Sequence, residues 1–131
     1  EWGHLHWNAI ASAYGSSPFF EYYQDDIRPF FEKRYEFLLD FNEEIRRTVC
    51  NLIGIEPHIE YSSSYSEPAP GETDLRDVIH PKRRKAETIL PVQLKPYYQV
   101  FSEKYGFQPD LSIIDLLMNM GPESILILQN T

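Results

Sequence analysis

The placement of proline limits where this chain can form long helices. Seven of its ten prolines fall between Pro57 and Pro109, and a proline inside a helix removes a hydrogen bond and collides with the preceding turn. Helices are therefore expected before and after this stretch, and loops within it. The sequence predicts a mainly α fold, or an α+β fold with a few short strands. We expect one domain over residues 1–131, with a mobile loop over residues 62–92.

Two short segments of the middle region have the pattern of strands. Ile59 and Tyr61 alternate with polar residues, and residues 97–101 (YYQVF) are aromatic and β-branched. The second segment is predicted to be a strand, or an extended segment packed on the core. Residues 62–73 are rich in Ser, Pro, Gly and Glu, which is typical of a surface loop.

Before this region, the chain is predicted to form consecutive helices. Apolar residues recur at helical spacing as far as Tyr14. Ser17 followed by Pro18 is typical of a new helix, with Ser17 as its N-cap. A longer helix is predicted over residues 36–53 from one apolar stripe, and Gly54 is expected to end it.

Near the end of the chain, a further helix is predicted over residues 113–120. Ser112 and Asp115 fit a capping pattern in which the carboxylate reaches back to the backbone of the cap residue. This helix is apolar almost all round, which predicts that it is buried, and Gly121 is expected to end it. Within it, Asn119 needs hydrogen-bond partners, which either the following turn or a ligand would supply.

The composition argues against several kinds of partner and location. Twelve basic and twenty acidic residues give a net charge of −8, whereas nucleic acids and anionic membranes are bound by basic surfaces. No apolar run approaches the roughly 18 residues that a membrane span needs. The single Cys50 favours the cytoplasm, because small secreted domains commonly carry paired cysteines. Its position beside an apolar stripe predicts a small buried side chain.

Familiar cofactor and metal motifs are missing from the sequence. It contains no Walker loop, no G-x-G-x-x-G, no G-x-S-x-G and no H-E-x-x-H, so the cofactor is left unassigned. Cys50 has no second cysteine to share a metal. His4 and His6 are two residues apart and point to different faces of a helix, so no metal site is predicted.

Polar residues of the N-terminal helices are candidates for proton transfer or for binding a ligand. His6 is either a core histidine satisfied by a backbone carbonyl, or a general acid or base or a hydrogen-bond partner of a ligand. Tyr14 is likewise either a packing residue or a residue with one of these roles. Glu21 and Asp25 are four residues apart and share a helix face. Such a carboxylate pair can divide acid and base work, but helix caps and dipole partners explain it equally well.

The charged loop that follows residue 73 offers candidates for binding an anion. Arg76 and Lys82 either clamp a phosphate or carboxylate or are simply exposed. The run Lys82-Arg83-Arg84-Lys85 is in turn either a solvated loop or a contact for a polyanion.

Six strings occur in a recognisable order: HWNAIASAY, SPFFEYY, DFN, DLRDVIHPK, YYQVF and, most specific, PDLSIIDLLMNMGPES. Together they resemble the WbqC-like protein family of bacteria, which is associated with O-antigen and other surface-polysaccharide gene clusters. The resemblance runs over nearly the whole chain. Because family members carry a further N-terminal region, it implies that the chain is the C-terminal part of a longer protein. Carried over position by position, it implies these polar site residues: His6, Tyr14, Glu21, Asn42, Arg76, Lys82, Gln99, Asp115 and Asn119.

One hypothesis that follows is an enzyme that transfers or modifies a group on an activated sugar or another anionic small molecule. Arg76 and Lys82 would bind the anionic part, and His6 or Glu21 would handle protons. This hypothesis predicts that the polar residues converge on one cleft.

The alternative hypothesis is a noncatalytic binding or scaffold module of the same pathway. It predicts an exposed aromatic patch that consists of Phe19, Phe20, Tyr22 and Tyr23. Such a patch would also serve to dock the missing N-terminal region or a second copy of the chain.

Overall fold

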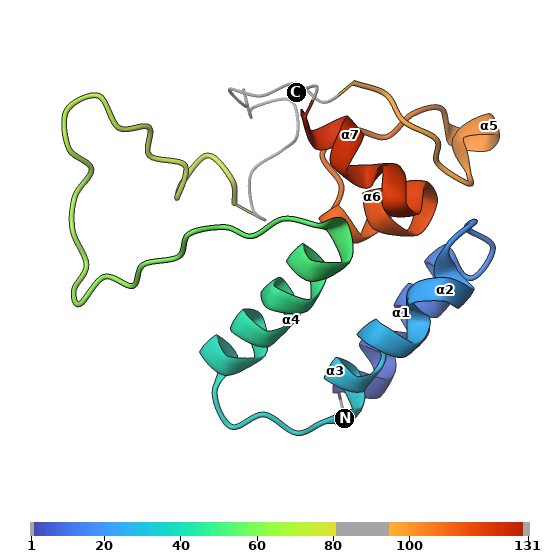
Figure 1. The fold of residues 1–131 in the computed structure, drawn as a ribbon, viewed down its shortest axis with the longest axis horizontal. Helices are drawn as coiled ribbons and strands as arrows, with labels where there is room; N and C mark the ends of the chain where they lie inside the picture. Colours follow the sequence, from blue (N-terminus) through green and yellow to red (C-terminus); the bar gives the residue numbers. More distant parts are fainter. Residues whose placement is uncertain (1, 81–94, 130–131) are drawn as a thin grey trace. The chain divides into compact units, whose positions relative to one another are not determined.

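The computed structural model describes residues 2–80 and 95–129. The chain divides into two compact units, residues 1–57 with 94–131 and residues 58–93. In the described ranges every regular element is a helix, and all of these helices belong to the first unit (Figure 1). The mainly α prediction is confirmed, and residues 59–61 and 97–101 form no strand.

The helices of the first unit bring distant parts of the sequence together. Helix α1 packs on α3, while α2 contacts α3, α4 and α6. At the C-terminal end, α6 packs with the short elements that follow it. In chain order the elements are α1 (Trp2–Tyr14), α2 (Phe20–Ile27), α3 (Pro29–Glu32), α4 (Leu38–Ile53), α5 (Ser102–Tyr105), α6 (Ile113–Met120), the 3-10 helix η2 (Gly121–Glu123) and α7 (Ser124–Gln129).

The turn between α1 and α2 differs from the prediction. Ser17 does not cap α2, which begins at Phe20 without a side-chain cap. Instead, both its hydroxyl (2.6 Å) and its backbone N–H (2.8 Å) donate to the carbonyl oxygen of Tyr14. Ser17 therefore satisfies a carbonyl at the end of α1, where helices lack internal donors. This contact fixes the end of the helix that carries Tyr14.

Helix α4 agrees closely with the predicted helix over residues 36–53. Gly54 ends it with a φ of 93°, a left-handed conformation that glycine adopts without strain. Its first apolar residue, Leu38, is 72% exposed, so the buried part of the stripe begins further along the helix. Cys50 is only partly buried, in contrast to its prediction as a buried side chain.

The core of the first unit is aromatic and aliphatic. Leu117 and Met118 of α6 are completely buried, which confirms the predicted burial of that helix. They pack in one cluster with side chains of α1, α2 and α4: Trp7, Phe20, Tyr23, Ile27, Val49 and Ile53.

A close contact joins the start of α2 to the end of α6. The backbone N–H of Phe19 donates to the carbonyl of Met118 at 3.0 Å. At Gly121, a β-carbon would lie only 2.6 Å from the Phe19 ring, and the φ of 55° also favours glycine. Gly121 therefore both ends α6, as predicted, and leaves room for Phe19.

The second unit contains turns but no helix or strand within residues 58–80. Residues 81–92 of the predicted mobile loop, with Lys82 and the rest of the basic run, lie outside the described ranges. The mobility of the loop and the prediction of a single domain stay predictions.

Candidate functional site

The candidate site starts from the first turn of α6. Ser112 caps this helix through its hydroxyl, which accepts a hydrogen bond from the N–H of Ile114 at 3.2 Å. The predicted second half of the cap does not form, because the carboxylate of Asp115 turns into the protein. Asp115 is 5% exposed. A carboxylate at this depth needs polar partners.

Neutral side chains surround the Asp115 carboxylate. Its Oδ2 accepts hydrogen bonds from the Tyr97 hydroxyl at 2.7 Å and from the Gln99 amide at 2.9 Å. Its Oδ1 accepts a longer hydrogen bond from the Asn119 amide, at 3.3 Å. These contacts attach residues 97–99, which precede α5, to α6.

The amide of Asn119 completes this attachment. Its Oδ1 accepts from the backbone N–H of Val100 at 3.0 Å, and its Nδ2 donates to the carbonyl of Asp115 at 2.8 Å. The partners of Asn119 are thus neither the following turn nor a ligand, the two sources that the sequence suggested. Asn119 instead holds the neighbouring segment in place.

Gln99 closes the loop that contains α5. Its Oε1 accepts from the N–H of Gln108 at 2.9 Å, and its Nε2 donates to the carbonyl of the same residue at 2.8 Å. With the bond to Asp115, both amide hydrogens of Gln99 are used. The loop over residues 99–108 is therefore fixed at its two ends.

This loop, α1 and α6 enclose a cavity of about 220 Å³. Its polar lining residues include Tyr14, Gln99, Gln108 and Asp115. Apolar side chains form the rest of the wall, and three of these remain substantially exposed: Phe101 (47%), Tyr105 (60%) and Leu111 (45%). A concave site with apolar walls and a few fixed polar groups is the usual form of a small-molecule site.

The two tyrosines beside Asp115 stay protonated at neutral pH. Burial, and then the charge and hydrogen bonding of Asp115, raise the pKa of Tyr14 to about 12. Burial and the hydrogen bond to Asp115 also raise the pKa of Tyr97. Both hydroxyls are therefore hydrogen-bond donors to the carboxylate and not bases.

The raised pKa of Tyr14 predicts a loss of stability in alkali. The folded state holds this proton up to about pH 12, whereas the unfolded chain releases it near its ordinary pKa of 10.0. The free energy of unfolding should therefore fall as the pH rises from 10 towards 12. In Tyr14→Phe the fall should be smaller, which urea denaturation at a series of pH values would measure. An identical pH dependence in the variant and the parent would contradict this assignment.

The structure does not bring the other predicted residues of the first unit to the cavity. His6 is exposed on α1, and its ring meets the edge of Trp2 at a centroid distance of 5.4 Å. Glu21 is exposed in the first turn of α2, and Asn42 is exposed on α4. None of the three lines the cavity. Their assigned roles stay predictions.

The predicted aromatic patch does not form. Phe20 is 8% exposed and Tyr23 is 2% exposed, whereas Tyr22 is 71% exposed. The reason is helical spacing, because Phe20, Tyr23 and Ile27 share the face of α2 that packs into the core.

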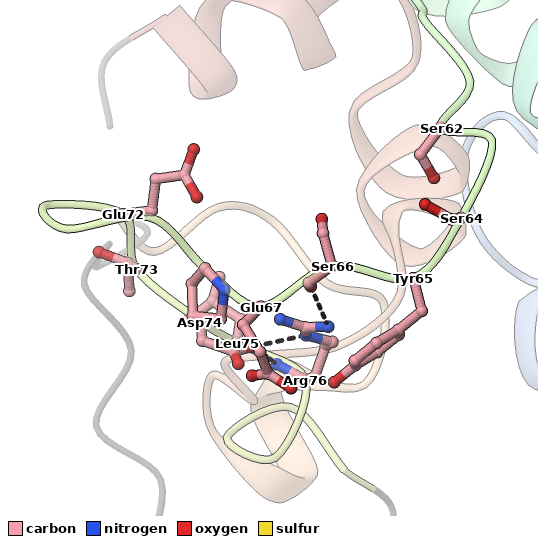
Figure 2. Close-up of a pocket in the computed structure, with 11 residues that line it drawn as sticks. Ser62, Ser64, Tyr65, Ser66, Glu67, Glu72, Thr73, Asp74, Leu75 and Arg76 are labelled. Atoms are coloured by element: carbon pink, nitrogen blue, oxygen red, sulfur yellow. Dashed lines mark hydrogen bonds and ion pairs between the residues drawn. The ribbon is translucent and has the colours of Figure 1, made fainter.

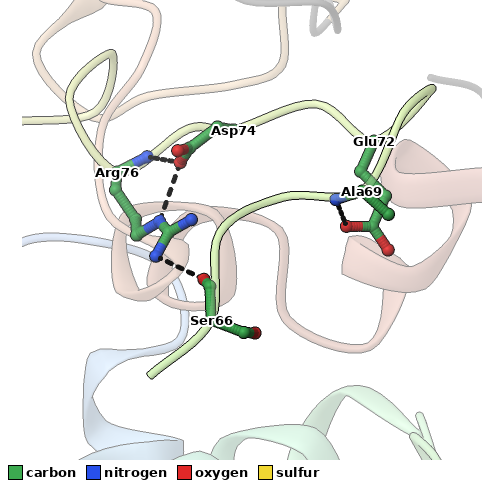
Figure 3. Close-up of polar contacts among 5 residues, drawn as sticks. All are labelled: Ser66, Ala69, Glu72, Asp74 and Arg76. Atoms are coloured by element: carbon green, nitrogen blue, oxygen red, sulfur yellow. Dashed lines mark hydrogen bonds and ion pairs between the residues drawn. The ribbon is translucent and has the colours of Figure 1, made fainter. Parts of the chain in front are cut away.

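In the second unit, Arg76 is held by its own loop. Its Nε lies 2.9 Å from Asp74 Oδ1, and its Nη1 donates to the carbonyl of Ser66 at 3.2 Å (Figure 3). The guanidinium carbon also lies 4.7 Å from the centre of the Tyr65 ring. The hydrogen bonds from Arg76 lower the pKa of the Asp74 carboxyl.

These residues help to line a hollow of about 780 Å³, and Figure 2 shows the side chains around it, which come from residues 62–76. Arg76 is engaged with three groups of this loop, so its role in clamping an anion stays a prediction. Its predicted partner Lys82 lies outside the described residues.

Within residues 2–80 and 95–129, no group of three or more His, Cys, Asp or Glu side chains is arranged to hold a metal ion. No helix in the same ranges has the length and apolar character to cross a bilayer.

Comparisons with known proteins place the chain among its relatives. The uncharacterized protein Rv1507c of Mycobacterium tuberculosis is 25% identical over 95% of this chain, and the chain spans 63% of that protein's length. No solved structure matches the chain. The sequence model of the WbqC-like protein family matches residues 1–91. This match includes Tyr14 but ends before the string from Pro109 on which the resemblance chiefly rested. Since it covers more than half of the sequence, the chain belongs to the WbqC-like protein family.

Proposed function

We propose that this chain is a ligand-binding module of bacterial surface-polysaccharide biosynthesis, and that its ligand enters the cavity at Asp115. The family resemblance suggests the pathway. The observation that supports a binding site is that Tyr14, Gln99 and Asp115, which lie far apart in the sequence, line one cavity. The single Cys50 supports a cytoplasmic location for this step.

The size of the cavity limits what can enter it. Its volume of about 220 Å³ is smaller than the roughly 300–1,000 Å³ of sites that enclose drug-sized ligands. It therefore suits a single sugar ring, which offers hydroxyl groups to the polar side chains and an apolar face to Phe101. A nucleotide attached to that sugar would remain outside.

The chemistry of the cavity favours binding over proton transfer. Tyr14 and Tyr97 have raised pKa values and remain protonated at neutral pH. His6 and Glu21, the predicted acid and base, do not line the cavity. These observations favour the noncatalytic module over an enzyme that modifies the sugar.

A complementation experiment tests this proposal. The gene is deleted in the source bacterium, and the surface polysaccharide is compared by gel electrophoresis and sugar analysis. The full gene product should restore the polysaccharide, and so should a His6→Ala, Glu21→Gln double variant. Asp115→Asn should fail to restore it at an equal protein level.

Each alternative predicts a different result. A polysaccharide that is unchanged by the deletion would contradict the proposed pathway. Failure of the double variant, together with full activity of Asp115→Asn, would favour an enzyme that uses His6 and Glu21.

A further inference from the structure

We propose that the ligand of the Asp115 cavity carries a protonated amine, as an amino sugar does. This inference depends on the cavity being the ligand site of the proposed function, and it specifies the class of ligand. It follows from the charge of the cavity, the nature of its walls and its size.

The charge of Asp115 has no counterpart in the described part of the chain. Its hydrogen-bond partners are the hydroxyls of Tyr14 and Tyr97 and the amides of Gln99 and Asn119, and all of these are neutral. Within residues 2–80 and 95–129 no Lys, Arg or His forms an ion pair with it. Buried carboxylates are commonly paired with a cation or a metal. A cationic ligand would supply this missing charge.

Lys104 of α5 does not take that role. Its ammonium lies 5.2 Å from the centre of the Tyr105 ring, and its side chain does not line the cavity. The acidic balance of the chain, with a net charge of −8, further favours a cation over an anion at this site.

The walls of the cavity suit an amine attached to a ring. Phe101 and Leu111 keep nearly half of their surface exposed although they line a concave site. Aromatic faces attract ammonium groups, and the same apolar side chains can cover a ring. The ammonium would reach Asp115 while the body of the ligand contacts Phe101.

The test compares two small probes that differ in charge. Cyclohexylamine and cyclohexanol have the same ring, and only the amine is charged at pH 7. We expect the intact chain to bind cyclohexylamine at least about tenfold more tightly than cyclohexanol in NMR titrations. The largest shifts should occur at the side-chain amides of Gln99 and Asn119.

Two variants assign this preference to Asp115. Asp115→Asn removes the charge in the cavity and should bind the two probes equally. Asp110→Asn removes the same charge from an exposed residue that does not line the cavity. The φ of Asp110 is 61°, which asparagine also tolerates. This control should keep the preference for the amine.

The comparison in the unmodified chain decides the question even if Asp115→Asn does not fold. Equal binding of both probes at the cavity would overturn the proposal that the ligand carries an amine, but it would leave the proposed binding site intact. Binding of neither probe would overturn both the amine ligand and the assignment of the cavity as a ligand site. The proposed pathway is tested separately, by the gene deletion. An equal loss of preference in Asp110→Asn would also overturn the inference, because it would indicate a general effect of surface charge.

Discussion

Asp115→Ala should lower the free energy of unfolding by about 3 kcal/mol. The substitution leaves the hydroxyl of Tyr97 and the amides of Gln99 and Asn119 without their shared acceptor. A buried donor without a partner costs roughly 1–3 kcal/mol. Because these three donors lie beside an open cavity that water can enter, the total loss of unfolding free energy should be less than the sum of three full penalties. Urea denaturation followed by circular dichroism measures the change.

Asp115→Asn and Asp110→Asn are the matched controls. Asparagine at position 115 keeps one acceptor oxygen, so the loss should be smaller, about 1 kcal/mol. At the exposed position 110 the change should lie within about 0.5 kcal/mol of zero. If Asp115→Ala were no more destabilising than Asp110→Asn, Asp115 would not be the centre of the network.

Leu117→Ala should have a still larger effect, about 3–5 kcal/mol. The side chain of Leu117 is completely buried and packs with residues of α1, α2 and α4. Its removal loses apolar burial and leaves a hole that the surrounding rings fill only in part. Thermal and urea unfolding would both report the loss.

Leu5→Ala is the control for this experiment, because Leu5 lies on α1 and is 67% exposed. It should change the stability by less than about 0.5 kcal/mol. Equal effects at positions 5 and 117 would show that α6 is not part of the core. The expected difference would establish that α6, which lies beyond the family match over residues 1–91, is essential to the fold of the first unit.

The helices were predictable where periodicity and a stop signal agree. Residues 38–53 carry an apolar stripe and are followed by Gly54, and the observed helix matches the predicted one to within two residues at each end. The buried α6 was predictable for the same reason, since an apolar segment followed by Gly121 permits few alternatives. These signals come from neighbouring residues, so a single sequence is enough to predict them.

The local details that were missed depend on tertiary contacts. Ser17 has the sequence context of an N-cap, but its hydroxyl donates backwards to Tyr14. Asp115 fits a capping box, but three side chains that approach from residues 97–99 and from α6 draw it inwards. A pattern along the chain cannot show that a distant segment will offer better partners.

The candidate site was therefore only partly predictable. Tyr14, Gln99 and Asp115 were selected and line one cavity, while Asn119 was selected and supports it. Tyr97 was missed as a site residue. Its signal was its position two residues before Gln99, because alternate residues of an extended segment share one face. Arg76 and Lys82 were predicted only because they are charged residues in a loop, and such a pattern does not indicate where their side chains lie.

The most direct test of the binding site is a crystal structure of the chain with cyclohexylamine. We expect one amine in the cavity, with its nitrogen about 3 Å from a carboxylate oxygen of Asp115 and its ring against Phe101. An amine bound elsewhere on the acidic surface, or a basic side chain of the protein already paired with Asp115, would contradict this expectation.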